Sequence, residues 1–166
     1  MLGFCIEGGY AIDYKKGYLI GVDLFAGAGG LSLGARMAGI DVKLAVEKDF
    51  YAAKTYTLNH PDTIVINDDV CMIRNIPESV TFGNSKIVLF GGPPCQGFST
   101  SNRRTNSKDN PQNWLYREFI RIINLVMPEW IVFENVTGFV EFAAGEFVNV
   151  LVGELLKSVT KAHIEF

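Results

Sequence analysis

Short apolar runs alternate along this chain with segments whose apolar residues recur every three or four positions. We predict a strand at each apolar run, namely residues 18–25, 42–46, 64–66, 86–90 and 130–133, and helices between them. Strands that alternate with helices build parallel sheets, because a parallel strand pair needs a long crossover connection. The sequence therefore predicts an α/β fold with a mostly parallel sheet and helices on both of its faces.

Periodicity and capping residues define the predicted helices. Leu31, Ala35 and Ala38 fall on one face of the first helix, which Gly39 closes. Asp49 can cap the second helix. The third helix carries an apolar stripe made by Leu115, Phe119, Ile122 and Val126. Two further elements are predicted towards the end of the chain, a helix over about 147–155 and a strand over 163–166.

The amino-acid composition limits the classes of protein to which this chain can belong. Of 166 residues, 48% are hydrophobic and 20% are charged, which suits a globular chain with a buried core. No apolar run approaches the roughly 20 residues of a membrane helix, so we expect no membrane attachment. Three widely spaced cysteines without metal-ligand spacing predict a reducing cytoplasm, no disulfide and no metal site. A net charge of -3 counts mildly against nucleic-acid binding.

A glycine cluster made by Gly27, Gly29 and Gly30 lies between the first predicted strand and the first helix. Glycines allow a tight turn, and the free N–H groups at a helix start favour an anionic ligand. Glu47 closes the second strand about 20 residues later, where a carboxylate can bind ribose hydroxyls. These residues predict a nucleoside-containing cofactor, either a dinucleotide or S-adenosylmethionine. The alternative is a tight structural turn beside a surface glutamate.

Acidic residues mark the ends of three predicted strands, at Asp23, Glu47 and Asp69. The carboxyl ends of parallel strands meet at one edge of the sheet, and open α/β sheets bind their ligands beyond that edge. Three acidic strand ends on one edge would be an odd coincidence in a purely structural protein.

A thiol and a carboxylate follow two further strands. Cys95 comes after a stiff Pro-Pro turn, in front of a polar stretch. Free cysteines are commonly buried small hydrophobes, which suits Cys5 and Cys71 better than Cys95. A protease-like thiol would need a histidine base, and neither histidine lies in a motif. Glu134 emerges from an apolar strand, where burial would raise its pKa toward a proton-donating range; the alternative is a capping or surface carboxylate.

Three motifs in this order resemble the cytosine-5 DNA methyltransferases. They are Asp-Leu-Phe-Ala-Gly-Ala-Gly-Gly at 23–30, Gly-Gly-Pro-Pro-Cys-Gln-Gly-Phe-Ser at 91–99 and Glu-Asn-Val at 134–136. The resemblance runs from about residue 18 to the end. It implies a Rossmann-like, S-adenosylmethionine-dependent methyltransferase fold, incomplete at the C-terminus. Residues 1–17 would be an N-terminal extension, and 18–166 the cofactor-binding and catalytic large domain, ending before the target-recognition domain.

The resemblance also implies residue roles. Cys95 would be the nucleophile, and Glu134 would engage N3 of the cytosine. Glu47 would hold the cofactor ribose, and Asp69 would accept from the adenine amino group. The full cofactor set would be Phe25, Ala26, Gly27, Gly29, Gly30, Glu47, Lys48, Asp69, Val70, Pro94 and Leu115. Substrate contacts would come from Gln96, Ser99, Arg103 and Asn135.

The implied reaction moves a methyl group from S-adenosylmethionine to C5 of a cytosine in DNA and leaves S-adenosylhomocysteine. The cytosine would be flipped out of the duplex and bound covalently to Cys95. The polar segment 97–113, with Arg103, would close over the DNA, or it would only keep a loop soluble. We expect a cytoplasmic or nucleoid-associated protein, in restriction–modification or in regulation.

Members of this family continue beyond the Glu-Asn-Val motif into an arginine motif, a variable DNA-reading domain and a last segment of the cofactor pocket. This sequence stops before all three, so we expect little activity from the chain alone. It would be a truncated product, or one half of a split enzyme whose second polypeptide carries the recognition domain. The remaining alternatives are a transfer-RNA cytosine-5 methyltransferase, a non-catalytic remnant and a nicotinamide-dependent dehydrogenase.

Overall fold

The computed structural model describes residues 19–77, 80, 85–94, 115–134, 149 and 152–153. Within these ranges the chain alternates strands and helices, as expected from its apolar pattern. The elements are β1 (Leu19–Leu24), α1 (Gly30–Met37), β2 (Asp41–Val46), α2 (Phe50–Asn59), β3 (Ile64–Ile66), the short 3₁₀ helix η1 (Val70–Met72), β4 (Lys86–Gly91), α3 (Leu115–Val126) and β5 (Trp130–Phe133).

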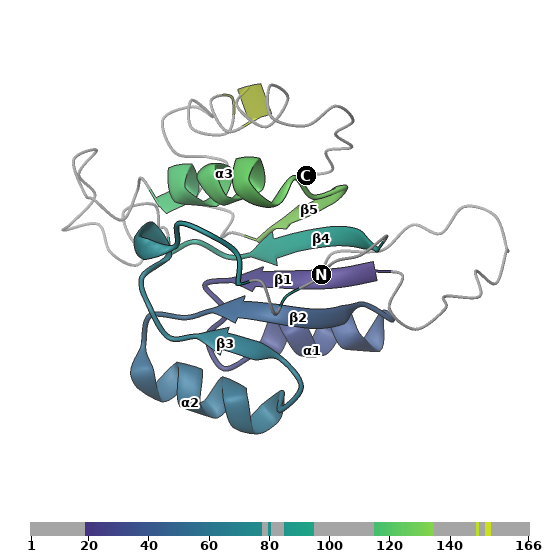
Figure 1. The fold of residues 1–166 in the computed structure, drawn as a ribbon, viewed down its shortest axis with the longest axis vertical. Coiled ribbons are helices and arrows are strands. Elements are labelled where there is room, and N and C mark those ends of the chain that lie inside the picture. The colour runs from purple at the N-terminus through teal and green to yellow at the C-terminus, as the bar shows by residue number, and fades with distance from the viewer. Residues whose placement is uncertain are drawn as a thin grey trace, which may run out of the picture.

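The five strands form one sheet in the order β3-β2-β1-β4-β5, and all four pairings between them are parallel (Figure 1). The predicted parallel α/β fold is confirmed. After β1 the chain builds outward through β2 to β3, and it then returns to the other side of β1 for β4 and β5. The point where this order reverses lies between β1 and β4, and open α/β sheets bind ligands beyond the carboxyl ends of the strands at such a point.

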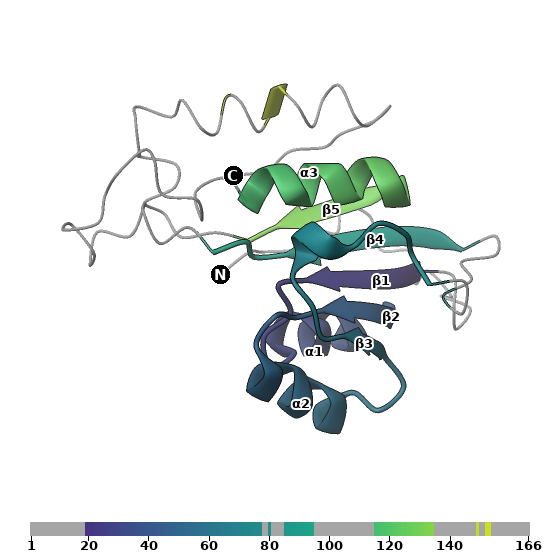
Figure 2. The ribbon, with the colours of Figure 1, turned by 60° about the vertical axis from the view of Figure 1, so that its left-hand side comes forward.

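One face of the sheet packs against α3, which lies next to β5 in both ribbon views (Figures 1 and 2). The predicted stripe of α3 is confirmed, since Phe119, Ile122 and Val126 are buried and Leu115 packs against the same cluster. The strand residues in this cluster are Val22, Leu24, Leu44, Val46, Ile87 and Leu89. Full burial of side chains of this size contributes about 1.5–3 kcal/mol each, and this is the largest apolar cluster among the described residues.

The opposite face is covered by α1 and α2, so the sheet has helices on both faces, as predicted. Tyr56 of α2 packs there on Ala45, and Ala35 of α1 packs on a second cluster with Phe90. The predicted face of α1 is wrong in one respect. Leu31 is 39% exposed, and the residue that α1 buries is Ser32, because a buried carboxylate on β1 provides a polar partner there.

Asp49 caps α2 as predicted, with its side chain accepting a hydrogen bond from the Ala52 N–H at 2.8 Å. The predicted N-terminal extension, most of the predicted helix over 147–155 and the predicted strand over 163–166 lie outside the described residues. Within the described part of the chain, no helix is both long and apolar enough to cross a membrane.

Candidate cofactor and active site

The glycine cluster forms a tight loop between β1 and α1, at the switch point of the sheet. Phe25, Gly27 and Gly29 all have positive φ angles, of 58°, 55° and 95°. The loop is tied to the sheet by the Ala26 N–H, which donates to the Val46 carbonyl at 3.1 Å, and is closed by the Gly29 N–H, which donates to the Ala26 carbonyl at 2.9 Å. This left-handed backbone favours glycine and leaves open space above Gly27.

A buried histidine packs against the glycine loop. His60 follows α2, and its Nε2 lies 3.0 Å from the Gly29 carbonyl oxygen. Its ring also packs against Tyr56, with centroids 4.6 Å apart. A β-carbon at Gly29 would collide with the His60 ring. Position 29 therefore needs glycine both for its φ and for this close approach.

Glu47 connects the glycine loop to the start of α2. Its Oε2 accepts a hydrogen bond from the Gly27 N–H at 2.7 Å, and its Oε1 accepts one from the Asp49 N–H at 2.7 Å. Each carboxylate oxygen keeps a second acceptor site, so Glu47 can also receive hydroxyl donors. The structure thus places Glu47 beside the glycine loop, as the sequence predicts for a ribose-binding carboxylate.

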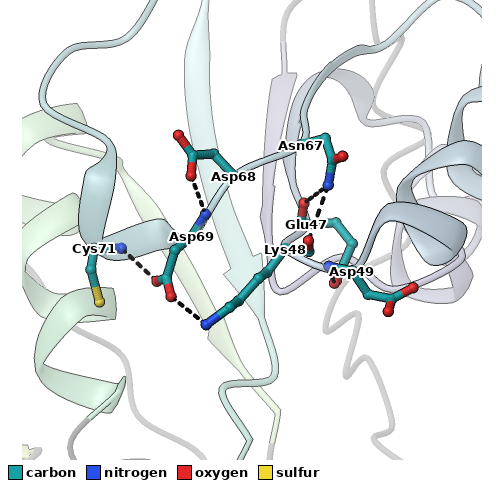
Figure 3. Close-up of polar contacts among 7 residues, drawn as sticks. All are labelled: Glu47, Lys48, Asp49, Asn67, Asp68, Asp69 and Cys71. Carbon is teal, nitrogen blue, oxygen red and sulfur yellow. Dashed lines mark hydrogen bonds and ion pairs between the residues drawn. The ribbon is translucent and has the colours of Figure 1, made fainter.

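A second polar group joins the ends of β2 and β3 (Figure 3). The Asn67 side-chain amide donates to the carbonyls of Glu47 and Lys48, at 2.9 and 3.1 Å. Lys48 Nζ donates to Asp69 Oδ2 at 2.7 Å, and the Cys71 N–H donates to Asp69 Oδ1 at 3.0 Å. The hydrogen bonds from Lys48 and Cys71 lower the pKa of Asp69 to about 2, so this carboxylate is charged at neutral pH.

Asp23 is the one of the three acidic strand ends that the structure buries within the sheet. It lies inside β1, fully buried, and its Oδ2 accepts a hydrogen bond from the Ser32 hydroxyl at 2.6 Å. The Ser32 oxygen also lies 2.5 Å from the Tyr56 hydroxyl, which donates in this pair when Ser32 gives its one proton to Asp23. Burial raises the pKa of Asp23 to about 7. Side chains alternate between the two faces of a strand, which turns Asp23 towards α1 and α2.

Glu134 lies beside the strand that leads to the predicted nucleophile. Its N–H donates to the Gly91 carbonyl at 3.0 Å, and its Oε2 occupies the space that a β-carbon on Gly92 would need. Glu134 is exposed, so the predicted burial of this carboxylate is wrong for the described structure. Its contact with Gly92, three residues before Cys95 in the sequence, does agree with the predicted pairing of the two motifs.

Of the other predicted cofactor residues, Val70 is buried in the main apolar cluster. Phe25 and Leu115 pack against this cluster from the loop after β1 and the start of α3, and Pro94 is half-buried after β4. Gly30 begins α1. The predicted residues Cys95, Gln96, Ser99, Arg103 and Asn135, with the segment 97–113, lie outside the described residues.

The structure adds four residues to this site that the sequence did not predict. Ser32 and Tyr56 are buried polar side chains on helices, and their positions carry no local sequence signal. Asn67 directly follows a predicted strand, which was a usable signal. Arg121 lies on the polar side of the third helix, where an arginine is usually solvated, yet it binds backbone carbonyls of the η1 segment.

A parallel sheet with a glycine loop after its first strand and a carboxylate after its second is the arrangement of Rossmann-like domains, a class that binds nucleoside cofactors. The chain belongs to the family of C-5 cytosine-specific DNA methylases, whose model matches residues 19–158.

Curated relatives agree with this family. The chain is 38% identical over 141 residues to the type II methyltransferase M.DdeI of Desulfomicrobium norvegicum, covering 83% of this chain and 33% of that protein. It is 34% identical over 148 residues to M.AquIA of Picosynechococcus sp., covering 87% of this chain and 59% of that protein. The chain thus spans between about a third and three fifths of these relatives' length.

Solved structures show the same fold. A crystal structure described as an E. coli DNA modification methyltransferase encoded within a prophage matches with a TM-score of 0.68 and 35% identity, over 84% of this chain and 38% of that one. Spodoptera frugiperda DNMT2 matches with a TM-score of 0.60 and 24% identity, over 84% of this chain and 41% of that one. The predicted Rossmann-like methyltransferase fold is confirmed.

Proposed function

We propose that this chain contributes the cofactor site and the nucleophile for transfer of a methyl group from S-adenosylmethionine to C5 of cytosine in DNA. The observation that carries the proposal is the contact of Glu134 with Gly92. It brings a carboxylate from the end of β5 to the turn that leads into Cys95, at the same edge of the sheet as the glycine loop.

The residues around the glycine loop fit a nucleoside. Glu47 has spare acceptor sites for a ribose diol, and Asp69 is an ionised acceptor suited to the adenine amino group. Phe25 and Leu115 add apolar walls on the main cluster, and Lys48, Val70 and Pro94 complete the proposed set with the loop residues 26–30. S-adenosylmethionine, when bound, supplies an electrophilic methyl group, and its product is S-adenosylhomocysteine.

The chemistry explains the need for a thiol and a carboxylate. Cytosine C5 is a poor nucleophile. Addition of the Cys95 thiolate to C6 makes the base electron-rich at C5, and Glu134 stabilises the adduct by a hydrogen bond or a proton at N3. After C5 has been methylated, a base removes the C5 proton, the C6–S bond breaks and the thiolate leaves. A thiolate is needed at the start, so we expect the pKa of Cys95 to be lowered in the complete site.

A stacked base cannot reach Cys95, so the target cytosine must be flipped out of the duplex at a cost of a few kcal/mol. We propose that Gln96, Ser99 and Asn135 contact this cytosine and that Arg103 meets a phosphate. Base-sequence reading and a complete pocket would come from regions of the relatives that this chain does not match, in the same or a second polypeptide. A protein that modifies DNA in a restriction–modification system or in regulation would act in the cytoplasm or at the nucleoid.

The first test is the nucleophile. In protein supplied with the region of M.DdeI that this chain does not match, Cys95→Ser should lower methyl transfer to DNA at least about a hundredfold, because an alcohol is a far weaker nucleophile at neutral pH. The same variant should bind S-adenosylhomocysteine with unchanged affinity in calorimetry. Cys5→Ser is the matched control and should keep full activity.

Two results would contradict the proposal. One is binding of NAD, but not of S-adenosylhomocysteine, by the wild-type chain, which would indicate a dehydrogenase. The other is methyl incorporation into transfer RNA but not into DNA, which would reassign the substrate and leave the roles of Cys95 and Glu134 in place.

A further inference from the structure

Arg121 on α3 belongs to none of the three motifs, yet it contacts the segment that carries Asp69. Its Nη1 donates to the Ile73 carbonyl at 2.8 Å and its Nη2 donates to the Val70 carbonyl at 2.9 Å. Its Nε donates to Glu118 Oε2 at 2.7 Å, one turn earlier on α3. All three guanidinium nitrogens therefore have an acceptor.

The two carbonyls belong to a short helix, η1, and to the residue that follows it. Asp69 caps the start of η1 through its bond to the Cys71 N–H. η1 is a single turn closed by two backbone hydrogen bonds, from the Met72 N–H to the Asp69 carbonyl and from the Ile73 N–H to the Val70 carbonyl. A helix this short has little stability of its own, so contacts from outside it matter. The planar fork of an arginine suits two neighbouring carbonyls, which the single ammonium of a lysine does not. Arg121 thus binds η1 at its first residue, Val70, and at Ile73, the residue just after it.

The segment 67–73 is consequently held from two sides. On the side of β2, Asn67 and Lys48 tie it to the end of that strand (Figure 3). On the other side, Arg121 ties it to α3, below which η1 lies in Figure 2. The Lys48 ion pair is exposed, and such pairs contribute little. The part-buried bonds of Arg121 are therefore the firmer of the two attachments.

We propose that Arg121 is a positioning residue for adenine recognition: from α3 it holds the backbone of η1, so that the Asp69 carboxylate and Val70 stay in place for the base. This inference rests on the proposed function, since it takes adenine as the group that Asp69 meets. Arg121 itself touches no ligand. Arg121 should therefore affect how strongly the site prefers a base with an amino group over a base without one.

The test compares binding of S-adenosylhomocysteine with that of its inosine analogue, in which an oxo group replaces the adenine amino group. A hydrogen bond to a charged acceptor is worth about tenfold or more in affinity, so the wild-type chain should prefer the adenine ligand by about that factor. Arg121→Gln should reduce this preference at least about threefold. Arg121→Lys, which keeps the charge and loses the planar guanidinium, should reduce the preference for the adenine ligand as well. If Arg121→Gln does not fold, the lysine variant alone tests the inference.

Two controls separate positioning from general damage. Arg74→Gln removes an exposed positive charge next to Ile73 and should keep the wild-type preference. In an Asp69→Ala background, Arg121→Gln should change the preference no further. Equal weakening of both ligands by the Arg121 variants would show a merely structural role and overturn the inference alone. Failure of the wild-type chain to bind S-adenosylhomocysteine would overturn the proposed function and this inference with it.

Discussion

Asp23 belongs to the first of the three motifs, and its side chain is buried inside the fold. Its carboxylate is fully buried at the end of β1, and the hydroxyls of Ser32 and Tyr56 reach it in series. Within the described residues, its second oxygen has no hydrogen-bond donor. An unpaired oxygen in an apolar surrounding favours the protonated acid, and the nearby Glu47 carboxylate adds to that preference.

The pKa of Asp23, about 7 in the folded chain against 3.8 ordinarily, predicts a pH dependence of stability. Between about pH 4 and 7 the folded state holds a proton that the unfolded state has lost. The free energy of unfolding should therefore fall as the pH rises through this range, by up to about 1.4 kcal/mol per pH unit from this group. Asp69, whose pKa is lowered to about 2, acts in a separate range, since its stabilisation is lost as the pH falls from about 4 to 2.

Urea unfolding at pH 5, 6, 7 and 8 measures this slope. Asp23→Asn stays neutral and can still accept from Ser32, so it should remove most of the decrease between pH 5 and 7. Asp62→Asn, which removes the same charge from an exposed position, should keep the decrease. Equal slopes in the wild type and in Asp23→Asn would show that Asp23 is ionised in the folded chain.

At the scale of elements, the junction of α1 and α2 decides the shape of the glycine loop. The helices meet where His60, after α2, lies against Gly29, the residue before α1. Gly29→Ala would place a β-carbon at a φ of 95° and against the His60 ring. We expect a loss of about 2–4 kcal/mol in the free energy of unfolding, from left-handed strain and displacement of the ring.

Gly34→Ala is the matched control for this prediction. Gly34 lies inside α1, and no neighbouring atom lies within 4 Å of the place that a β-carbon would take, so alanine should stabilise α1 by about 0.5–1 kcal/mol. Denaturant unfolding measures both variants, and S-adenosylhomocysteine binding should weaken only in Gly29→Ala. A neutral Gly29→Ala variant would mean that His60 does not hold the loop.

The elements themselves were largely predictable from the sequence, and their contacts were less so. Strands and the α3 stripe follow from apolar periodicity, and the cap at Asp49 follows from local chemistry. The face that α1 buries depends on Ser32 meeting Asp23 of β1, which no local pattern encodes. The glycine loop and Glu47 could be assigned to the site because each follows a predicted strand. Arg121 could not, because its contacts with η1 are likewise not encoded by a local pattern.

At the scale of the whole molecule, the carboxyl edge of the sheet carries the proposed cofactor residues and Glu134, one of the two proposed catalytic groups. Large apolar side chains remain exposed on α1 and α2, the two helices that share one face of the sheet, with Leu33 at 56%, Met37 at 82% and Leu58 at 76%. About two thirds of the length of M.DdeI lies outside the region that this chain matches.

We expect this chain alone to bind S-adenosylhomocysteine without transferring methyl groups to DNA. The glycine loop, Glu47 and Asp69 are assembled within the described fold, so the purified chain should bind S-adenosylhomocysteine in calorimetry. Methyl transfer to DNA also needs a flipped base held in place, and the relatives M.DdeI and M.AquIA are both longer than the region that this chain matches. The chain should show no measurable transfer of labelled methyl groups until the unmatched region of M.DdeI is added. Rapid transfer by the unsupplemented chain would show that its own residues suffice to grip DNA.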